Sequence, residues 1–188
     1  MKFCNRIVER SKEEFRLIRI SAGVAFFLLI IDQLTKLLVE QQMTLGKPLP
    51  IIDGVFSLTY VTNPGAAWGM FSGYGIVLFI IGVLVVAAAI YKLRKLCDGY
   101  PERYVAVMTV ISGVIGNSID RIWRGEVVDF LDCWIGSYRW PTFNIADCAI
   151  CIGIGIFMIS AMFRPEPAKK DQPEAEKTAK QESAASDK

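Results

Sequence analysis

Hydrophobic residues in this chain fall in four long blocks that are separated by polar segments. The blocks cover residues 20–39, 74–91, 104–122 and 145–163. A helix needs about 20 mostly apolar residues to cross the hydrocarbon core of a bilayer, and each block has about that length. The pattern therefore predicts an all-α integral membrane protein with four transmembrane helices.

Basic residues are distributed unevenly between the segments that connect these blocks. Six Lys and Arg residues precede the first block, four lie in 92–103, and six lie in 164–188. The two remaining loops contain only Lys47, Arg124 and Arg139. Because positively charged loops tend to stay in the cytoplasm, we expect both termini there. We expect the first block to be an uncleaved anchor, since no small-x-small cleavage site follows it.

The 41–73 segment is the longer of the two loops expected on the outer side of the membrane. Within it, residues 55–62 alternate in hydrophobicity and are rich in β-branched and aromatic side chains, which is typical of strands. The following Asn63, Pro64 and Gly65 predict a turn. We therefore expect a small β-sheet on the outer, periplasmic face.

The chain divides into a membrane domain, residues 1–163, and a charged segment, residues 164–188. The second segment contains no Leu, Ile, Val, Phe, Tyr or Trp. Because such a composition cannot bury a core, we expect a disordered cytoplasmic tail.

Composition then excludes several classes of function. The chain is 53% hydrophobic and 21% charged with a net charge of +2, which argues against a soluble enzyme and against nucleic acid as a partner. It contains no histidine, so Ser-His-Asp and Cys-His catalysis and His-containing zinc sites are excluded. We interpret the five cysteines as small apolar filler.

The polar residues of the membrane blocks are the candidates for function, because ionisable groups in a span are costly. With the expected orientation, all of them lie in the outer half of the membrane, close to two carboxylates of the last outer loop. Such convergence on one side predicts a site. The residues concerned are Asp32, Lys36, Asn117, Asp120, Arg121, Asn144 and Asp147 in the blocks, and Asp129 and Asp132 in the loop.

Without histidine, a hydrolase has two routes to a general base. One is a Ser–Lys pair, in which Lys36 would act with Ser118 or Ser112. The other is a pair of carboxylates around one water, where an ionised Asp takes a proton and a protonated Asp polarises the scissile carbonyl. Sequence spacing does not choose two from the five candidates, which are Asp32, Asp120, Asp129, Asp132 and Asp147.

Each of these residues also has a purely structural interpretation. Asp32 and Lys36 are spaced i,i+4 and can pair on one helix face. Asp120 could form a local ion pair with its neighbour Arg121. We expect Asp132 to face water. Asn144 is a natural N-cap for the last block, whose first turn Asp147 could satisfy.

Two other classes of function use the same polar residues. A small proton-coupled transporter could employ Asp32, Asp120 and Asp147 as a relay, although such sites tend to lie near the bilayer midplane. A structural or chaperone-like membrane protein would need none of the carboxylates. The crowding of charge on one side argues against a path across the membrane.

Five short motifs, taken in order, resemble the lipoprotein signal peptidase family, also called signal peptidase II. The resemblance covers roughly residues 20–163 and rests on the order of the motifs rather than on any one of them. It implies an aspartic endopeptidase that removes the signal peptide from prolipoproteins, cutting before a diacylglyceryl-modified cysteine. The motifs are Asp32-Gln33-Leu34-Thr35-Lys36, Asn63-Pro64-Gly65-Ala66-Ala67-Trp68-Gly69, Gly116-Asn117-Ser118-Ile119-Asp120-Arg121, Val127-Val128-Asp129-Phe130 and Phe143-Asn144-Ile145-Ala146-Asp147.

The resemblance also implies roles for individual residues. The catalytic pair would be Asp129 and Asp147, and Asp32, Lys36 and Asp120 would support the site without performing chemistry. It further implies a monomer in the bacterial inner membrane, in contact with lipids, with its active site on the outer side and sensitive to the antibiotic globomycin. No cofactor or metal is expected, because two carboxylates supply both acid and base. Substrate-binding positions would be Asn63, Gly65, Asn117, Arg121, Asn144 and Ala146.

Overall fold

The computed structural model describes residues 2–66 and 69–164. The expected disordered tail therefore lies, from residue 165 onward, outside the described residues. The helices are α1 (Lys2–Gln42), α2 (Gly75–Tyr91), α3 (Leu93–Cys97), α4 (Pro101–Trp123) and α5 (Ile145–Phe163). The strands are β1 (Pro48–Ile52), β2 (Phe56–Asn63), β3 (Val127–Ile135) and β4 (Tyr138–Arg139).

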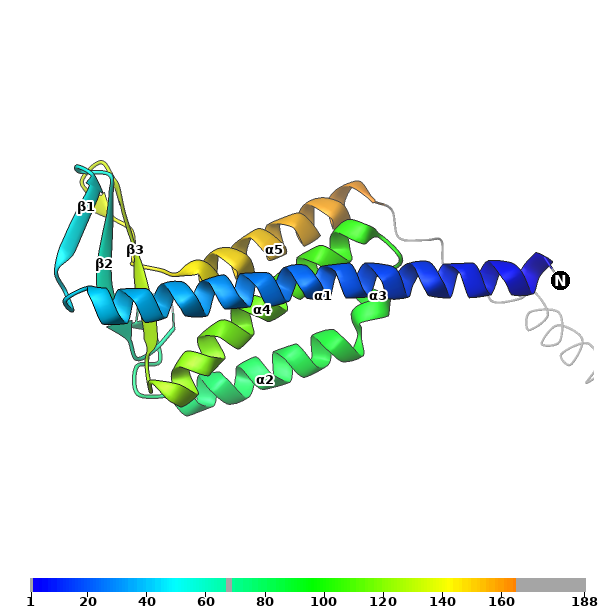
Figure 1. The fold of residues 1–188 in the computed structure, drawn as a ribbon, viewed down its shortest axis with the longest axis horizontal. Coiled ribbons are helices and arrows are strands. Elements are labelled where there is room, and N and C mark those ends of the chain that lie inside the picture. The colour runs from blue at the N-terminus through cyan, green and yellow to red at the C-terminus, as the bar shows by residue number, and fades with distance from the viewer. Residues whose placement is uncertain (1, 67–68, 165–188) are drawn as a thin grey trace, which may run out of the picture.

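The long helices lie alongside one another, and the sheet covers one end of them (Figure 1). Helix α4 is central, because it contacts α1, α2 and α5. Small residues allow its close approach to α5. A Cβ atom at Gly113 would collide with the Ala146 carbonyl, and one at Gly153 would lie 2.7 Å from the Ala106 carbonyl oxygen. Such contacts between backbones are typical of helices that pack within membranes.

All four hydrophobic blocks form helices, as predicted. Among the described residues, α1, α4 and α5 are long and apolar enough to cross a membrane, whereas α2, with 17 residues, is slightly shorter. Helix α1 is longer than its block, with 41 residues. The segment before residue 20 contains neither proline nor glycine, so nothing interrupts the helix there.

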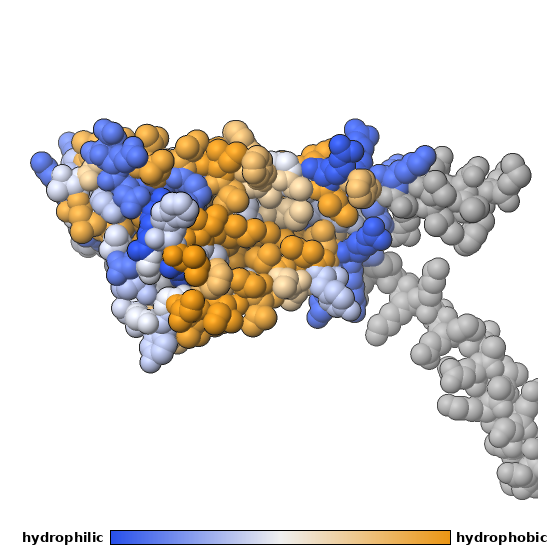
Figure 2. All heavy atoms as spheres, turned by 60° about the horizontal axis from the view of Figure 1, so that its bottom comes forward, coloured by the Kyte–Doolittle hydropathy of each residue, from blue (hydrophilic) through white to orange (hydrophobic). Residues whose placement is uncertain are grey.

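On the face shown in Figure 2, apolar side chains form a belt over the middle of the molecule, with polar residues toward both ends. Exposed members of this belt include Phe27 on α1, Leu84 on α2 and Ile152 on α5. An apolar surface of this extent is unfavourable in water and fits a hydrocarbon environment. The mostly helical architecture with this belt is that of a membrane protein.

The sheet is antiparallel, with its strands in the order β1-β2-β3-β4. The strand predicted at residues 55–62 is present as β2, and the same loop also contributes β1, for which no strand was predicted. Strands β3 and β4 belong to the segment between α4 and α5, for which no strand was predicted. The pairing of β2 with β3 sets Val61 opposite Asp129 and Asn63 opposite Val127. It therefore brings the Asn63 turn beside the carboxylate of β3.

Candidate active site

The first turn of α5 fixes the position of Asp147. The Asn144 side chain caps the helix by accepting a hydrogen bond from the Asp147 backbone N–H at 3.0 Å, and one Asp147 carboxylate oxygen accepts from the Asn144 N–H at 3.2 Å. This reciprocal arrangement is a capping box. The predicted N-cap is thus confirmed, and Asp147 keeps its second carboxylate oxygen for other partners.

Asp129 lies on β3 and is buried. Its carboxylate accepts two hydrogen bonds from side-chain amides. The Nδ2 atom of Asn144 donates to Oδ1 at 2.7 Å, and the Nδ2 atom of Asn63 donates to Oδ2 at 3.1 Å. The strand register and the helix cap together hold this carboxyl group in place.

A chain of amides connects the two carboxylates. Asn117 of α4 donates from Nδ2 to Oδ1 of Asp147 at 2.8 Å, and its Oδ1 accepts from Nδ2 of Asn144 at 3.1 Å. Asn144 in turn reaches Asp129. Both aspartates line the same cavity of about 740 Å³. The structure therefore brings together two of the five candidate carboxylates, from separate segments of the chain, at one cavity.

The environment of Asp129 favours its protonated form. Burial, followed by the nearby charge of Asp147, raises the pKa of the Asp129 carboxyl from 3.8 to about 7. The two amide hydrogen bonds act in the opposite direction. Two neighbouring carboxyls with this arrangement can hold one proton between them near neutral pH.

Arg121 and Gly65 form one wall of the cavity. The Arg121 guanidinium donates to the Gly65 carbonyl at 2.9 Å and to the Asn117 carbonyl at 3.0 Å. The Gly65 N–H donates to Oδ1 of Asn63 at 3.0 Å. Of the expected substrate-binding residues, Asn63, Gly65, Asn117 and Arg121 line the cavity.

The two other expected substrate-binding residues, Asn144 and Ala146, are buried and are not among the residues that line the cavity. The Ala146 backbone N–H donates to Oδ1 of Asp32 at 2.8 Å. A carboxylate of α1 thereby caps the start of α5. Asn144 and Ala146 therefore lie behind the residues that line the cavity and support their positions.

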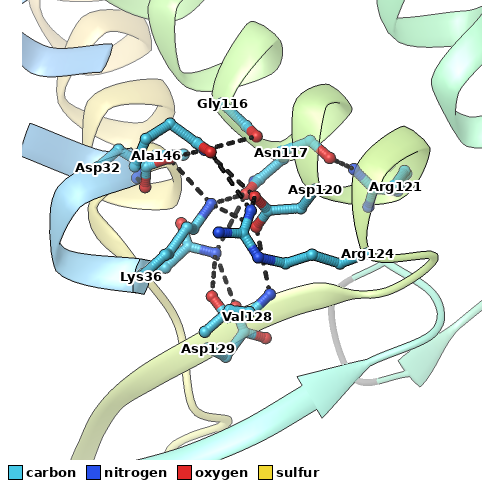
Figure 3. A network of polar contacts seen from close by, with 12 residues as sticks. Asp32, Lys36, Gly116, Asn117, Asp120, Arg121, Arg124, Val128, Asp129 and Ala146 are labelled. Atoms are coloured by element: carbon cyan, nitrogen blue, oxygen red, sulfur yellow. Dashed lines mark hydrogen bonds and ion pairs between the residues drawn. The ribbon is translucent and has the colours of Figure 1, made fainter. Parts of the chain in front are cut away.

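The expected supporting residues form a buried network beneath the cavity (Figure 3). The Lys36 ammonium lies 3.0 Å from Oδ2 of Asp32 and 2.8 Å from Oδ2 of Asp120. The predicted i,i+4 pair is confirmed. Asp120 also accepts from Arg124 at 2.8 Å and from the Val128 N–H at 3.2 Å. It thereby links α4 to β3.

The structure corrects the suggested local pair between Asp120 and Arg121. Asp120 pairs with Lys36 and Arg124, whereas the Arg121 guanidinium donates to the backbone carbonyls of Asn117 and Gly65. Adjacent residues of a helix point about 100° apart, whereas residues four apart share a face. Arg124 is therefore the helix neighbour that can reach Asp120.

Asp132 was expected to face water, and this was wrong. It is only 2% exposed, it accepts from the Thr59 hydroxyl at 2.7 Å, and Arg139 donates to both its oxygens at 2.8 Å. The hydrogen bonds from Arg139 lower the pKa of the Asp132 carboxyl. Asp132 therefore connects strands and remains outside the cavity lining.

The geometry does not support a Ser–Lys pair. The hydroxyl of Ser118 donates to the Val114 carbonyl, and that of Ser112 donates to the Thr109 carbonyl. The Lys36 ammonium contacts two carboxylates and an amide oxygen. It therefore forms ion pairs with acids and does not contact a serine hydroxyl that it could activate.

Several cavity residues were missed by sequence reasoning. Cys148 and Cys151 line the cavity, whereas the filler interpretation suits the fully buried Cys97. The Cys-x-x-Cys spacing of Cys148 and Cys151 on α5 was a signal that both could line the same cavity. Residues three apart share a helix face, and Asp147 lies next to Cys148 in the sequence. Trp140, Pro141 and Thr142 also line the cavity, and nothing in their sequence pattern indicated this.

Comparisons with known proteins agree on one family. Residues 24–163 match the family model described as Signal peptidase (SPase) II. The chain is 42% identical over 154 residues to the lipoprotein signal peptidase of Geobacter sulfurreducens, covering 80% of this chain and 96% of that protein. It is 40% identical over 149 residues to that of Geobacillus kaustophilus, covering 79% and 97%.

Solved structures show the same similarity. One bacterial membrane enzyme, determined by the in meso method at 2.3 Å resolution, superposes with a TM-score of 0.72 at 34% identity, covering 80% of this chain and 94% of that chain. A second, at 1.9 Å resolution, superposes with a TM-score of 0.71 at 36% identity, covering 78% and 94%.

Proposed function

This chain belongs to the signal peptidase II family and is an aspartic-type peptidase, and we propose that Asp129 and Asp147 are its catalytic pair. The observation that carries this proposal is the amide chain through Asn144 and Asn117, which holds both carboxyls at one cavity. Metal-free peptide hydrolysis needs one acid and one base around a water, and two such carboxyls provide both.

In this mechanism Asp129, whose pKa is raised to about 7, supplies the proton, and Asp147 acts as the base. Asp147 takes a proton from water while the water oxygen bonds to the scissile carbonyl carbon, and Asp129 gives its proton to the carbonyl oxygen. Asp147 then passes its proton to the leaving nitrogen as the C–N bond breaks. Asp129 recovers a proton from a hydroxyl of the intermediate, so the pair returns to its starting state.

The substrate that we propose is a diacylglyceryl-modified prolipoprotein, cut just before the modified cysteine. The cavity is bordered by Ile150 and Ile152, whose helix contributes to the apolar belt (Figure 2). A lipid-anchored peptide could thus reach the carboxyls without leaving the bilayer. Arg121, Asn63 and Gly65 also line the cavity and supply polar groups for contact with the peptide. The same cavity is the proposed binding site of globomycin.

We propose that all four long apolar helices cross the bacterial inner membrane. Both termini would lie in the cytoplasm, and the sheet and cavity would lie on the outer side. The uneven distribution of Lys and Arg supports this orientation. The enzyme would act as a monomer, since one chain supplies both carboxyls. The transporter alternative is not favoured, because the matched family is one of peptidases.

The test uses the purified protein with a diacylglyceryl-modified precursor and its unmodified twin, each with and without globomycin. We expect cleavage of the modified precursor only, and inhibition by globomycin. Asp129→Asn and Asp147→Asn should each abolish cleavage while the protein stays folded. Asp53→Asn, which changes an exposed carboxylate in the turn between β1 and β2, is the matched control and should cleave normally. Normal cleavage by either active-site variant would remove that residue from the pair.

A further inference from the structure

Lys36 is a buried cation to which the mechanism above gives no chemical step. Its side chain is fully buried, and its ammonium contacts Asp32 at 3.0 Å, Asp120 at 2.8 Å and Oδ1 of Asn117 at 3.0 Å. Burying an ammonium group is costly unless every donor has a partner, and here each of its three N–H bonds has one. Two of these partners are charged, and the third belongs to the amide that reaches Asp147.

The contact with Asn117 determines which way that amide faces. The side-chain amide of asparagine has one accepting end and one donating end. In the observed orientation, Oδ1 faces the Lys36 ammonium and Nδ2 donates to Asp147 at 2.8 Å. If the amide were reversed, its NH₂ group would face an ammonium and its oxygen would face a carboxylate. Both contacts would then be repulsive.

We propose that Lys36 is a positioning residue for the hydrolysis: its ammonium fixes the Asn117 amide so that this amide donates to Asp147. This inference rests on the proposed catalytic pair. Asn144 donates to the same Asn117 oxygen at 3.1 Å, and Lys36 adds a charged donor, which forms a stronger hydrogen bond than a neutral one. The first-helix lysine thereby acts on the reacting groups through one intervening side chain (Figure 3).

The charge of Lys36 also acts on the pair directly, since it lowers the pKa of Asp129. Removing that charge should therefore let Asp129 keep its proton to a higher pH. The alkaline limb of the pH–rate profile should move upward. The charged groups around Lys36 and the cavity are Asp32 on α1, Asp120, Arg121 and Arg124 on α4, Asp129 on β3 and Asp147 on α5.

A double-mutant cycle tests the proposal. We expect Lys36→Met to lower kcat by roughly tenfold to a hundredfold, with KM within about twofold of wild type, because small displacements of reacting groups are costly to rate. Asn117→Ala should have a loss at least as large. If Lys36 acts through Asn117, the double variant should be no slower than Asn117→Ala alone. Losses that multiply would overturn the proposal, as would a wild-type kcat for Lys36→Met.

Arg124→Met is the matched control. It removes another cation from Asp120, but the Arg124 guanidinium donates to Glu40, Gln33 and Asp120 rather than to Asn117. Its kcat should therefore stay near wild type, and its pH–rate profile should not move. Should Lys36→Met fail to fold, the charge-balanced variant Lys36→Met/Asp120→Asn removes one charge of each sign. The kcat of this double variant should be lower than that of Asp120→Asn alone, by the same factor that is expected for Lys36→Met relative to wild type. A kcat equal to that of Asp120→Asn would overturn the proposal.

Failure of this inference is distinguishable from failure of the proposed function. Wild-type protein that does not cleave the modified precursor, or Asp129→Asn protein that does, would contradict the catalytic pair. If wild type is active, Asp129→Asn is inactive and Lys36→Met is fully active, the proposed catalytic pair stands. The proposed positioning role of Lys36 is then wrong. Melting temperatures of all variants show which of them are folded.

Discussion

Asp129 and Asp132 lie three residues apart on β3, yet different groups face their carboxyls. Asp129 is surrounded by neutral amides and lies near another carboxylate, whereas Asp132 accepts two hydrogen bonds from Arg139. The pKa of Asp129 is accordingly raised to about 7, and that of Asp132 is lowered. Of these two carboxyls, only Asp129 can hold a proton near neutral pH and serve as an acid.

The pH dependence of cleavage should follow Asp129. Below about pH 7 its carboxyl keeps the proton that the mechanism requires, and above that pH the proton is lost. The rate should therefore fall on the alkaline side with an apparent pKa of about 7. The measurement is kcat/KM for the modified precursor over roughly pH 5 to 9. A rate that stays constant up to the highest pH would contradict a protonated Asp129.

Asp132→Asn should affect stability more than turnover. The change weakens a hydrogen-bonded ion pair with the half-exposed Arg139, which should cost about 1–2 kcal/mol in the free energy of unfolding. Because Asp132 does not line the cavity, kcat should stay near wild type. Thermal unfolding and a cleavage assay, each compared with Asp53→Asn, check this. A large loss of turnover would place Asp132 in the chemistry.

At the residue scale, the sequence identified the important side chains and their partners within one helix, such as Lys36 for Asp32, but not their partners on other elements. The membrane blocks made Asp32, Lys36 and Asp147 candidates because charge is costly there. Which carboxylates meet depends on how separate segments pack, and spacing does not contain that information. Asp132 was misjudged because an acidic residue in an apparent loop is usually solvated, and its strand and its Arg139 partner were not recognised.

Among the elements, the start of α5 is the most constrained. Asn144 caps it from within, and the Asp32 carboxylate caps it from α1. On the α4 side, Gly113 lets the Ala146 carbonyl approach closely. These contacts come from different elements, so the position of Asp147 depends on the packing of the whole α1–α4–α5 group.

Gly113→Ala should disturb this packing. Its new Cβ would collide with the Ala146 carbonyl, which is backbone and cannot turn aside. We expect a loss of about 1–3 kcal/mol in stability and reduced cleavage, because the start of α5 must shift. Gly155→Ala is the control: a Cβ there has open space, so stability should be unchanged or slightly higher. Equal melting temperatures for the two variants would contradict the close packing.

The elements themselves were predictable to different degrees. Apolar blocks of about 20 residues gave all four long helices, since the membrane constraint on length is strong. The boundaries of α1 were less predictable, because its polar N-terminal extension has no hydrophobic signal. Strand β3 was not predicted, although Val127, Val128 and Phe130 favour a strand. Its carboxylates suggested a solvated loop, and its pairing with β2 spans a long distance in sequence.

The face shown in Figure 2 has an apolar middle, a mixed polar and apolar sheet end, and a polar opposite end. The cavity with Asp129 and Asp147 is lined by residues of β2 and β3 and of α4 and α5, and Figure 3 shows Asp129 on its strand facing the helices. The cavity lining is itself a border between the two carboxyls and the apolar residues Ile150 and Ile152 of α5. A water-dependent reaction on a lipid-anchored peptide requires such a border, because it needs both water and access from the bilayer.

The orientation of the molecule gives a final prediction. If the sheet faces outward, a cysteine at the exposed position Asp53 should react with a membrane-impermeant maleimide in intact cells, provided that any outer membrane is permeabilised. A cysteine at Lys95, exposed on α3 at the other end, should react only after the inner membrane is opened. Both variants are made in a background with the five native cysteines replaced by alanine, and precursor cleavage shows that each is folded.

The opposite labelling pattern would contradict this orientation and would place the cavity on the cytoplasmic side. Because Lys and Arg are sparse in the two loops at the sheet end and frequent elsewhere, such an insertion would violate the charge rule.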